Sequence, residues 1–412
     1  MPTIRVGTAS PATSPTRSAT LNRLAHLAHR AASESIDVFL LPEAFIGGYP
    51  HGSTFGCVVG ERTVQGREEF AKYFDGAVDL GDIVGGGAGA GDRWVKRELP
   101  GLGDANLRGD GTREELEKIA NETGVFIVTG LVEKAGGSLY CSVVYVCPKE
   151  GMVGKRRKVM PTAAERLIWA QGSPSTLRAI STTIRGTRVN LAAAICWENY
   201  MPVVRQALYS QNINLYLAPT ADDRDAWLSL MRTIGIEGRC FALTSNMAVK
   251  RDGPAVQTSP SLPRARRGSI ITDEGFQIAL PASPTKQKRR KSVFDEDGNE
   301  IVLCCDAENG DAKPVNGQKK VSVLSDAKRA GSGWVRRGGS CIVNPYGDVI
   351  AGPQWEDDEG IIYADIDLRD CIRGRLDMDT AGSYSRNDSF KFSVEGLDLD
   401  PLPYQYRDGE QP

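Results

Sequence analysis

The 412-residue sequence predicts a layered fold of mixed helices and strands, of the α/β or α+β class. Short apolar runs of strand length recur along the chain, and segments whose apolar residues follow helical spacing alternate with them. Such alternation is typical of domains in which helices cover the faces of sheets. Two long segments poor in apolar residues interrupt the pattern, and we expect them to be insertions on one compact core.

The N-terminal part of the chain predicts a strand, a helix and a second strand. Residues 3–9 and 36–41 are apolar runs of strand length. The first 33 residues lack acidic side chains, as a transit peptide would, but a strand and a core helix explain them better. The apolar positions of that helix recur every three or four residues: Leu21, Leu24, Ala25, Ala28 and Ala32.

The middle and C-terminal parts continue the alternation. Thr112 and Glu115 form a capping-box pattern that opens a helix ending near Gly124. Residues 125–132 and 139–147 are apolar runs around a Gly-Gly pair, which predicts a β-hairpin. A helix is expected around residues 203–208, and the remaining predicted strands cover residues 189–195, 213–217, 241–247, 340–343 and 361–366.

The two interrupting segments cover residues 76–111 and 250–333. The first is glycine-rich, and its run at 85–91 lacks the Lys-Ser/Thr pair of a phosphate-binding loop, so a flexible loop is favoured. The second is rich in Pro, Ser and charged residues, and we expect it to be partly disordered. Strand-like runs at 270–271, 276–280 and 301–304 show that it is not wholly structureless.

Composition excludes several classes of function. A net charge of −2 gives no reason to expect nucleic acid or an acidic membrane as a partner. No apolar run approaches the roughly 18–20 residues that span a bilayer. The nine cysteines are scattered without a CxxC pair, which argues against structural zinc and fits a reducing compartment such as the cytoplasm.

Histidine is scarce, which narrows the catalytic options. The three histidines are His26 and His29 on the predicted first helix and His51 in a loop. A Cys–His or Ser–His–Asp hydrolase needs a histidine beside its nucleophile, and only His51 is available for that. A hydrolase of this composition would therefore use a carboxylate as its base, and a histidine-rich metal site is disfavoured.

Three residues could carry chemistry, although each has a simpler explanation. Cys196 ends an apolar strand at a turn, where backbone N–H groups could stabilise a thiolate or an oxyanion, but a buried structural cysteine is about as plausible. Glu43 follows a buried strand, where lost hydration would raise its pKa, or it is a solvated loop residue. Lys158 ends a run of four cations, which usually marks a solvated face, although one buried lysine could stabilise negative charge.

Taken together, these residues resemble the nitrilase superfamily of carbon–nitrogen hydrolases. The similarity lies in LPEAFIGGYP at 41–50, RKVMPT at 157–162 followed by Glu165, and CWENYMP at 196–202. Later landmarks are EGRCF at 237–241 and, further on, Gly338-Gly339-Ser340 with Pro345-Tyr346-Gly347. The resemblance covers most of residues 3–249 and 334–390 outside the glycine-rich insertion. The Cys-Trp-Glu sequence is similar to the nitrilase branch.

The resemblance implies an α+β fold, a four-layer α-β-β-α sandwich. It implies one domain over residues 1–390, with insertions at about 76–111 and 250–333, and a tail at 391–412. It also assigns roles in a catalytic site: Cys196 as nucleophile, Glu43 as general base, Lys158 as charge stabiliser, Glu165 as an orienting carboxylate, the Trp197 backbone N–H as an oxyanion donor and Tyr49 as a pocket wall. Thr233 and Ser383 stand where many nitrilases carry histidine.

The implied activity is hydrolysis of an organic nitrile to the carboxylic acid and ammonia. The chemistry would pass through a thioimidate and a thioester on Cys196, with no metal or organic cofactor. Cleavage of a small amide and hydration that stops at the amide are the alternatives, and a non-catalytic binding protein is a distant third. The expected partner is a small nitrile or amide, and the expected assembly is a homodimer or larger homo-oligomer in the cytoplasm, bound to neither nucleic acid nor membrane.

Overall fold

The computed structural model describes residues 3–58, 60–84, 92–97, 109–251 and 333–397, with the backbone of four short strands between 269 and 303. The chain forms two units, one of residues 1–251 with 333–412 and the other of residues 252–332. The second unit contains two strand pairs, β14 (Ser269–Ile271) with β15 (Gln277–Ala279) and β16 (Lys291–Phe294) with β17 (Glu300–Leu303). The glycine run at 85–91 lies outside the described residues.

The first unit contains two large sheets, and the first of them joins the N-terminal strands to a meander. Its β1, β2 and β6 run parallel, whereas β6, β7 and β8 form an antiparallel meander. Its spatial order is β20 (Ile361–Ile366), β1 (Ile4–Ala9), β2 (Val38–Leu40), β6 (Phe126–Ala135), β7 (Ser138–Cys147) and β8 (Gly151–Arg157), with β5 (Val78–Asp79) beside β6.

The second sheet has a similar plan. Its β10, β11 and β12 run parallel, and β18 pairs antiparallel with β12, β13 and β19. Its spatial order is β13 (Ala248–Lys250), β18 (Trp334–Val343), β12 (Phe241–Asn246), β11 (Leu215–Thr220), β10 (Thr187–Ala193) and β9 (Ile180–Ile184), with β19 (Val349–Trp355) beside β18. A small separate pair joins β3 (Cys57–Val58) to β4 (Glu61–Arg62).

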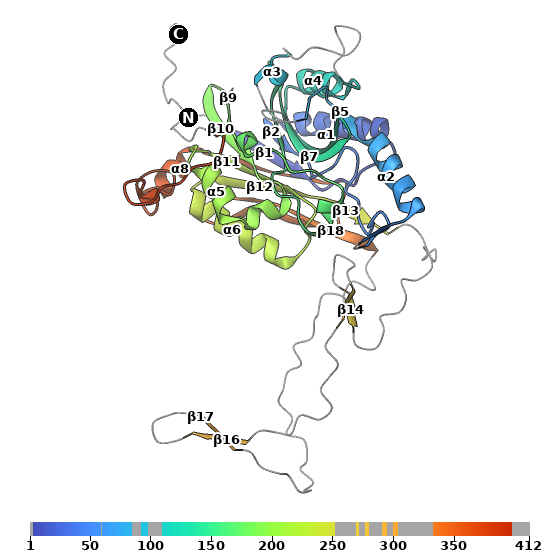
Figure 1. Cartoon of the computed structure of the whole chain (residues 1–412). Helices are drawn as coiled ribbons and strands as arrows, with labels where there is room; N and C mark the ends of the chain where they lie inside the picture. The colour runs from blue at the N-terminus through green and yellow to red at the C-terminus, as the bar shows by residue number, and fades with distance from the viewer. Residues whose placement is uncertain are drawn as a thin grey trace. The chain divides into compact units, whose positions relative to one another are not determined.

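Four layers result, and the predicted α-β-β-α sandwich is confirmed (Figure 1). Helices α1 (Arg17–Ser33) and α4 (Thr112–Thr123) cover the outer face of the first sheet, where Leu24 and Leu116 join one apolar cluster. Helices α5 (Pro202–Tyr209) and α6 (Asp225–Gly238) cover the second sheet in the same way. Between the sheets, side chains such as Val128 and Leu217 share a third buried cluster.

The remaining helices lie outside these two covering layers. They are α2 (Val64–Gly76), α3 (Asp92–Val95) and α8 (Arg369–Gly374), with the 3₁₀ turns η1 (Ala163–Leu167), η2 (Pro174–Thr176), η3 (Cys196–Tyr200) and η4 (Ser383–Ser385). The described part of the glycine-rich insertion packs partly against the core. Its Trp94 is buried and donates its indole N–H to the carbonyl of Leu80.

One predicted helix cap is wrong, although the helix itself lies where it was predicted. Helix α4 begins at Thr112, but its N-cap is Gly111 in the left-handed conformation, and no side chain caps it. A capping box occurs instead at Thr162 and Glu165, at the start of η1. Strands β8 and β9 and helices α2 and α6 carry no strong sequence signal and were not predicted.

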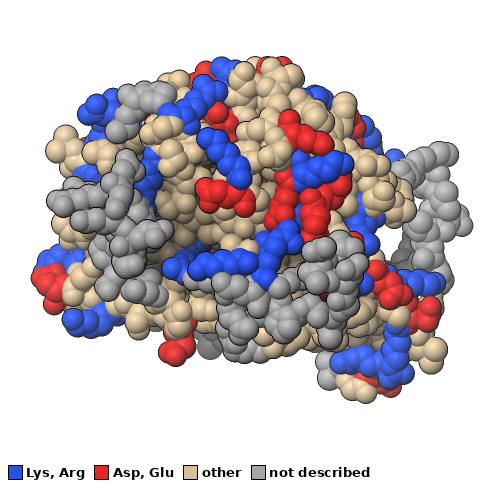
Figure 2. Space-filling view, turned by 90° about the horizontal axis from the view of Figure 1, so that it is seen from above, with Lys and Arg blue, Asp and Glu red and all other residues tan. Residues whose placement is uncertain are grey.

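The surface agrees with a nearly neutral chain. On the face in Figure 2, positive and negative side chains are interspersed, without a broad field of one sign. Among the described residues, no helix is both long and apolar enough to span a bilayer.

Candidate active site

The predicted site residues come together between the two sheets, at strand ends. Glu43 follows β2 and Lys158 follows β8, so both leave the first sheet. Cys196 follows β10 in the second sheet and begins η3. Because these strands end close together, residues that are far apart in sequence share one buried site. Lys158, for example, bonds to Glu43 across 115 positions.

A buried lysine joins two carboxylates at the centre of the site. The Nζ atom of Lys158 lies 2.7 Å from Glu43 Oε1 and 2.8 Å from Glu165 Oε2. The side chains of Lys158 and Glu43 are fully buried, and that of Glu165 is nearly so. Tyr49 donates its hydroxyl to Glu165 Oε1 at 2.8 Å, which fixes the second carboxylate.

The electrostatics give Glu43 the properties of a base. Burial raises the pKa of Glu43 to about 7; Glu165 adds to this effect, and Lys158 and the Cys196 thiol partly offset it. The second carboxylate oxygen of Glu43, Oε2, has no hydrogen-bond partner among the described residues. Burial alone would lower the pKa of Lys158, but the two carboxylates hold that pKa well above its ordinary value, so the ammonium stays charged.

Cys196 is held in a strained backbone conformation. Its φ is 53°, in the left-handed region that non-glycine residues rarely adopt, and such strain is typical of functional turns. The hydroxyl of Thr220 lies 3.2 Å from Cys196 Sγ, and ligand atoms of Cys196, Glu43 and Glu165 all lie within 4.8 Å of one another. Burial and the two carboxylates raise the pKa of the thiol well above its usual range. A backbone N–H of Ala221 acts in the opposite direction but is outweighed, so the resting protein holds a neutral thiol beside a base.

Glu198 is a buried residue of the site to which sequence reasoning gave no role. Its Oε1 accepts from Arg156 at 2.7 Å and from the backbone N–H of Val159 at 2.6 Å. Its Oε2 accepts from the backbone N–H of Ile195 at 2.8 Å. One carboxylate therefore ties the residue after Lys158 to the residue before Cys196. Only its position two residues after Cys196 could have drawn attention to it.

The run of four cations before and at Lys158 is not a solvated face. Lys155 and Arg157 share Glu133, at 2.5 Å and 2.6 Å, and Arg156 pairs with Glu198. The four side chains are at most 2% exposed. The default interpretation of this run is wrong because its acidic partners lie far away in sequence.

Trp197 directly follows Cys196, and its ring is held by two charged side chains. Its indole N–H donates to Asp222 Oδ2 at 3.1 Å, and the guanidinium of Arg224 stacks 4.5 Å from its ring. Arg224 is also bonded to Asp222, at 2.7 Å and 2.5 Å. The ring is thus fixed from two sides, and it can serve as a rigid wall.

The same cluster offers donor atoms of the kind that metals bind, from Glu43, Glu165 and Cys196. However, the ammonium of Lys158 already stands between the two carboxylates, within 2.9 Å of an oxygen of each. A positive charge therefore fills the position that a cation would take, and the donor set fits a lysine-centred site better.

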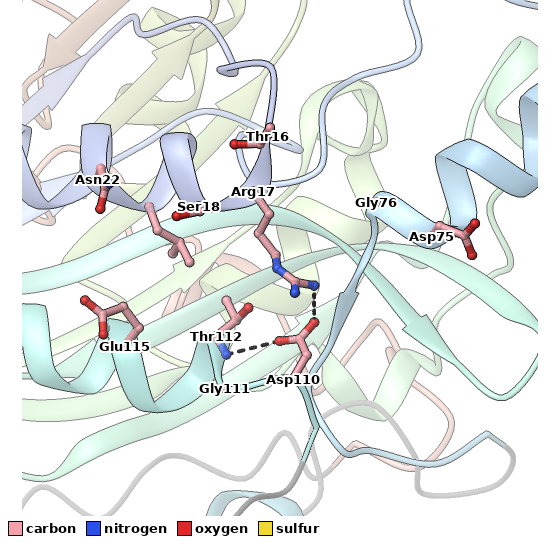
Figure 3. Close-up of a pocket in the computed structure, with 11 residues that line it drawn as sticks. Thr16, Arg17, Ser18, Asn22, Asp75, Gly76, Asp110, Gly111, Thr112 and Glu115 are labelled. Atoms are coloured by element: carbon pink, nitrogen blue, oxygen red, sulfur yellow. Dashed lines mark hydrogen bonds and ion pairs between the residues drawn. The ribbon is translucent and has the colours of Figure 1, made fainter.

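A separate surface pocket of about 550 Å³ lies between the N-terminal ends of α1 and α4 (Figure 3). An ion pair between Arg17 and Asp110 crosses it, and Asp110 also accepts from the backbone N–H of Thr112. Its cation is already neutralised by Asp110, and none of the predicted site residues lines it. We assign no chemistry to this pocket.

Comparison with known proteins agrees with this geometry. The carbon–nitrogen hydrolase family model matches residues 3–375. The chain is 36% identical over 395 residues to nitrilase blr3397 of Bradyrhizobium diazoefficiens, covering 95% of this chain and 92% of that protein. It is 36% identical over 382 residues to an arylacetonitrilase of Trametes versicolor, covering 91% and 90%. The crystal structure of Saccharomyces cerevisiae Nit3, a member of branch 10 of the nitrilase superfamily, has a TM-score of 0.54 at 15% identity, covering 93% of this chain and 97% of that one.

Proposed function

The chain belongs to the carbon–nitrogen hydrolase family, and from this premise we propose that it hydrolyses an organic nitrile to the carboxylic acid and ammonia. The observation that supports the proposal most directly is the buried Lys158, bonded to Glu43 and Glu165 beside the Cys196 thiol. A neutral thiol, a base with a pKa of about 7 and a fixed cation are the groups that covalent attack on a nitrile requires.

In the proposed mechanism, Glu43 takes the proton of Cys196 as the sulfur attacks the nitrile carbon. The nitrile nitrogen gains that proton, and a thioimidate forms. Water then adds, ammonia leaves, and a thioester remains on Cys196. A second water, deprotonated by Glu43, releases the carboxylic acid and restores the thiol. Lys158 stabilises the negative charge that develops at each addition, since it is preorganised and excluded from solvent.

Glu165 and Tyr49 act on the reaction through Lys158. Their chain of contacts, hydroxyl to carboxylate to ammonium, holds Nζ in place while Glu43 changes its protonation state. We assign the backbone N–H of Trp197 as a donor to the developing negative charge, and the rings of Tyr49 and Trp197 as walls of the substrate volume.

Intact-mass spectrometry during turnover of a panel of nitriles and matched amides tests the proposal. We expect a thioimidate or thioester adduct on Cys196, with acid and ammonia as products from nitriles. Adducts and acid from amides alone would make the enzyme an amidase, and amide as the main product would make it a hydratase. A folded protein without adducts or products from either set would contradict catalysis.

Substitution of each reacting group separates the roles. We expect Cys196→Ala to abolish both adduct and turnover, and Glu43→Gln and Lys158→Met to lose nearly all turnover while remaining folded. Exposed His26→Gln on α1 is the matched control and should keep wild-type rates. Turnover within a few-fold of wild type in Glu43→Gln or Lys158→Met would contradict that residue's role.

We further propose that residues 1–390 form one hydrolase domain with insertions at about 76–111 and 250–333, and that the enzyme acts in the cytoplasm as a homodimer or larger homo-oligomer. The seven described cysteines are all free thiols, which supports a reducing compartment. Sedimentation at several protein concentrations tests the assembly, and a monomer at all of them would contradict it.

A further inference from the structure

His51 lies one aromatic ring away from the proposed catalytic carboxylates. Its imidazole packs on the ring of Tyr49, with 4.6 Å between the ring centroids. Tyr49 in turn donates its hydroxyl to Glu165, which holds Lys158. His51 therefore touches a residue that the proposed mechanism uses, although the mechanism gives His51 itself no role.

The contacts of His51 determine which ring nitrogen carries the proton. Its Nδ1 lies 3.3 Å from a guanidinium nitrogen of Arg336, whose other terminal nitrogen lies 3.3 Å from Asp223. A guanidinium only donates hydrogen bonds, so Nδ1 must accept. In a neutral imidazole the proton then sits on Nε2.

The imidazole is neutral under ordinary assay conditions. Burial lowers the pKa of His51 to about 3, and the positive charge of Arg336 contributes in the same direction. Between pH 5 and 9 the side chain therefore presents one fixed N–H donor rather than a titrating charge.

The Nε2 donor is buried and has no partner among the described residues. An unpaired buried donor is unfavourable, and buried polar groups in folded proteins are nearly always paired with protein, water or ligand. The imidazole ring packs on Tyr49 and its Nδ1 accepts from Arg336, so Nε2–H is the one polar group of the side chain that the described residues leave unused.

We propose that His51 Nε2–H is a substrate-binding donor that selects nitriles carrying an oxygen acceptor, such as an ether, hydroxyl or carbonyl oxygen, a few bonds from the nitrile carbon. This inference rests on the proposed nitrile hydrolysis. A site built to donate a hydrogen bond disfavours an analogue that lacks the acceptor, because the buried donor is then left unpaired.

Matched nitriles that exchange one oxygen for a methylene test this selectivity. Suitable pairs are 3-methoxypropionitrile with pentanenitrile and phenoxyacetonitrile with 3-phenylpropionitrile. We expect wild type to prefer the ether of at least one pair in kcat/KM. In His51→Phe, which keeps a ring against Tyr49 but has no donor, that preference should fall by about fivefold to tenfold, the worth of one neutral hydrogen bond.

Two further variants complete the design. His51→Gln retains an N–H near the position of Nε2 and should keep part of the preference. His29→Phe makes the same substitution at an exposed histidine on α1 and should leave the preference unchanged.

A ratio of kcat/KM for the ether to kcat/KM for its methylene analogue that is equal in His51→Phe and wild type, with both nitriles hydrolysed, would overturn the His51 proposal. It would leave the proposed nitrile hydrolysis intact. No hydrolysis of any nitrile by wild type would contradict the proposed function itself.

A measurement that needs no turnover checks the tautomer. Nitrogen chemical shifts of ¹⁵N-histidine-labelled protein distinguish the two neutral tautomers, and His51→Phe assigns the signal among the three histidines. We expect the proton on Nε2 throughout pH 5 to 9. A proton on Nδ1, or a charged imidazole near neutral pH, would contradict the proposal.

Discussion

At the scale of single residues, the site works by keeping one carboxylate hard to ionise and one ammonium hard to neutralise. Glu43 and Glu165 face the same Lys158 Nζ, and burial raises the pKa of Glu43 to about 7. A base with a pKa near the working pH is ionised often enough to act and still has a strong affinity for the thiol proton.

This predicts the pH dependence of the reaction. Only ionised Glu43 can take the Cys196 proton, and its raised pKa means that ionisation is lost as pH falls through about 7. We expect kcat/KM for a nitrile to decrease about tenfold per pH unit below that value. A pH–rate profile from 5 to 9 measures it. An acidic limb near 4 to 5, the range of an ordinary carboxyl, would contradict this role for Glu43.

The sequence identified the reacting residues better than the residues that hold them. Glu43, Lys158 and Cys196 stand in short motifs, and the resemblance of these motifs to the nitrilase superfamily singled the three residues out. Glu198 and Thr220 act through contacts with residues that are distant in sequence or in another element, and no periodicity encodes such contacts. The burial of the cations at 155–158 could not be predicted for the same reason, because their acidic partners are also distant in sequence.

At the scale of elements, the hairpin of β6 and β7 positions Glu43 by close approach of two backbones. Gly130 in β6 bonds to the carbonyl of Pro42, and a Cβ there would lie 2.3 Å from that carbonyl oxygen and 2.7 Å from the Cα of Glu43. No shift of a flexible side chain can relieve that overlap, because the obstructing atoms belong to the backbone.

Gly130→Ala should therefore move Glu43 and lower kcat by about 100-fold, the usual effect of displacing a reacting group by roughly 1 Å. Gly137→Ala, in the turn of the same hairpin, meets nothing within 4 Å and serves as the control. Steady-state rates and thermal unfolding of both variants make the comparison. Equal kcat for the two variants would contradict the close-approach argument.

The clamp between β8 and η3 is the second element-scale device. Glu198→Gln removes the charge that pairs with Arg156, and both side chains are at most 2% exposed. An uncompensated buried charge costs about 3–5 kcal/mol, so we expect the free energy of unfolding to fall by roughly that amount. Activity should fall as well, because the clamp joins the backbone beside Lys158 to that beside Cys196.

Urea unfolding measures the effect of Glu198→Gln. Asp388→Asn, which breaks an exposed ion pair with Arg386, should leave the free energy of unfolding nearly unchanged, because solvent screens exposed charges. A Glu198→Gln variant as stable as this control would show that the buried pair is not a clamp.

Element prediction succeeded where apolar periodicity was strong, as in the hairpin at 126–147 and in α1. It failed where local chemistry pointed elsewhere. Strand β8 ends in cations that suggested a solvated face, and the cap of α4 depends on a left-handed glycine rather than on Thr112.

At the scale of the whole molecule, the order of strands in the two sheets could not be read from periodicity, because alternation of apolar residues does not specify which strands are neighbours. Only the family resemblance predicted the sandwich.

The long insertion leaves and rejoins the core at one point. Arg251 N bonds to Gly333 O at 2.9 Å, beside the antiparallel pair β13 and β18.

Replacing residues 252–332 by an Asn-Gly turn should therefore preserve the core, since two-residue turns of this type suit antiparallel strands and a shorter loop is cheaper to close. We expect the midpoint of thermal unfolding to stay within about 1.5 °C of wild type, which corresponds to roughly 1 kcal/mol for a core of this size. Calorimetry of the full chain and of the shortened chain measures it. A collapse of cooperative unfolding would show that the second unit supports the first.

The chain after the insertion supplies strands to both sheets. Strand β18 lies between β13 and β12 in the second sheet, and β20 lies beside β1 in the first. A break in the backbone at the insertion would thus leave two fragments whose strands interleave. The longer fragment would hold Glu43, Lys158 and Cys196 but would expose unpaired strand edges without the shorter one. Nitrile turnover would then report on the reassembly of the two fragments, which makes the insertion a natural point at which to split the enzyme for complementation.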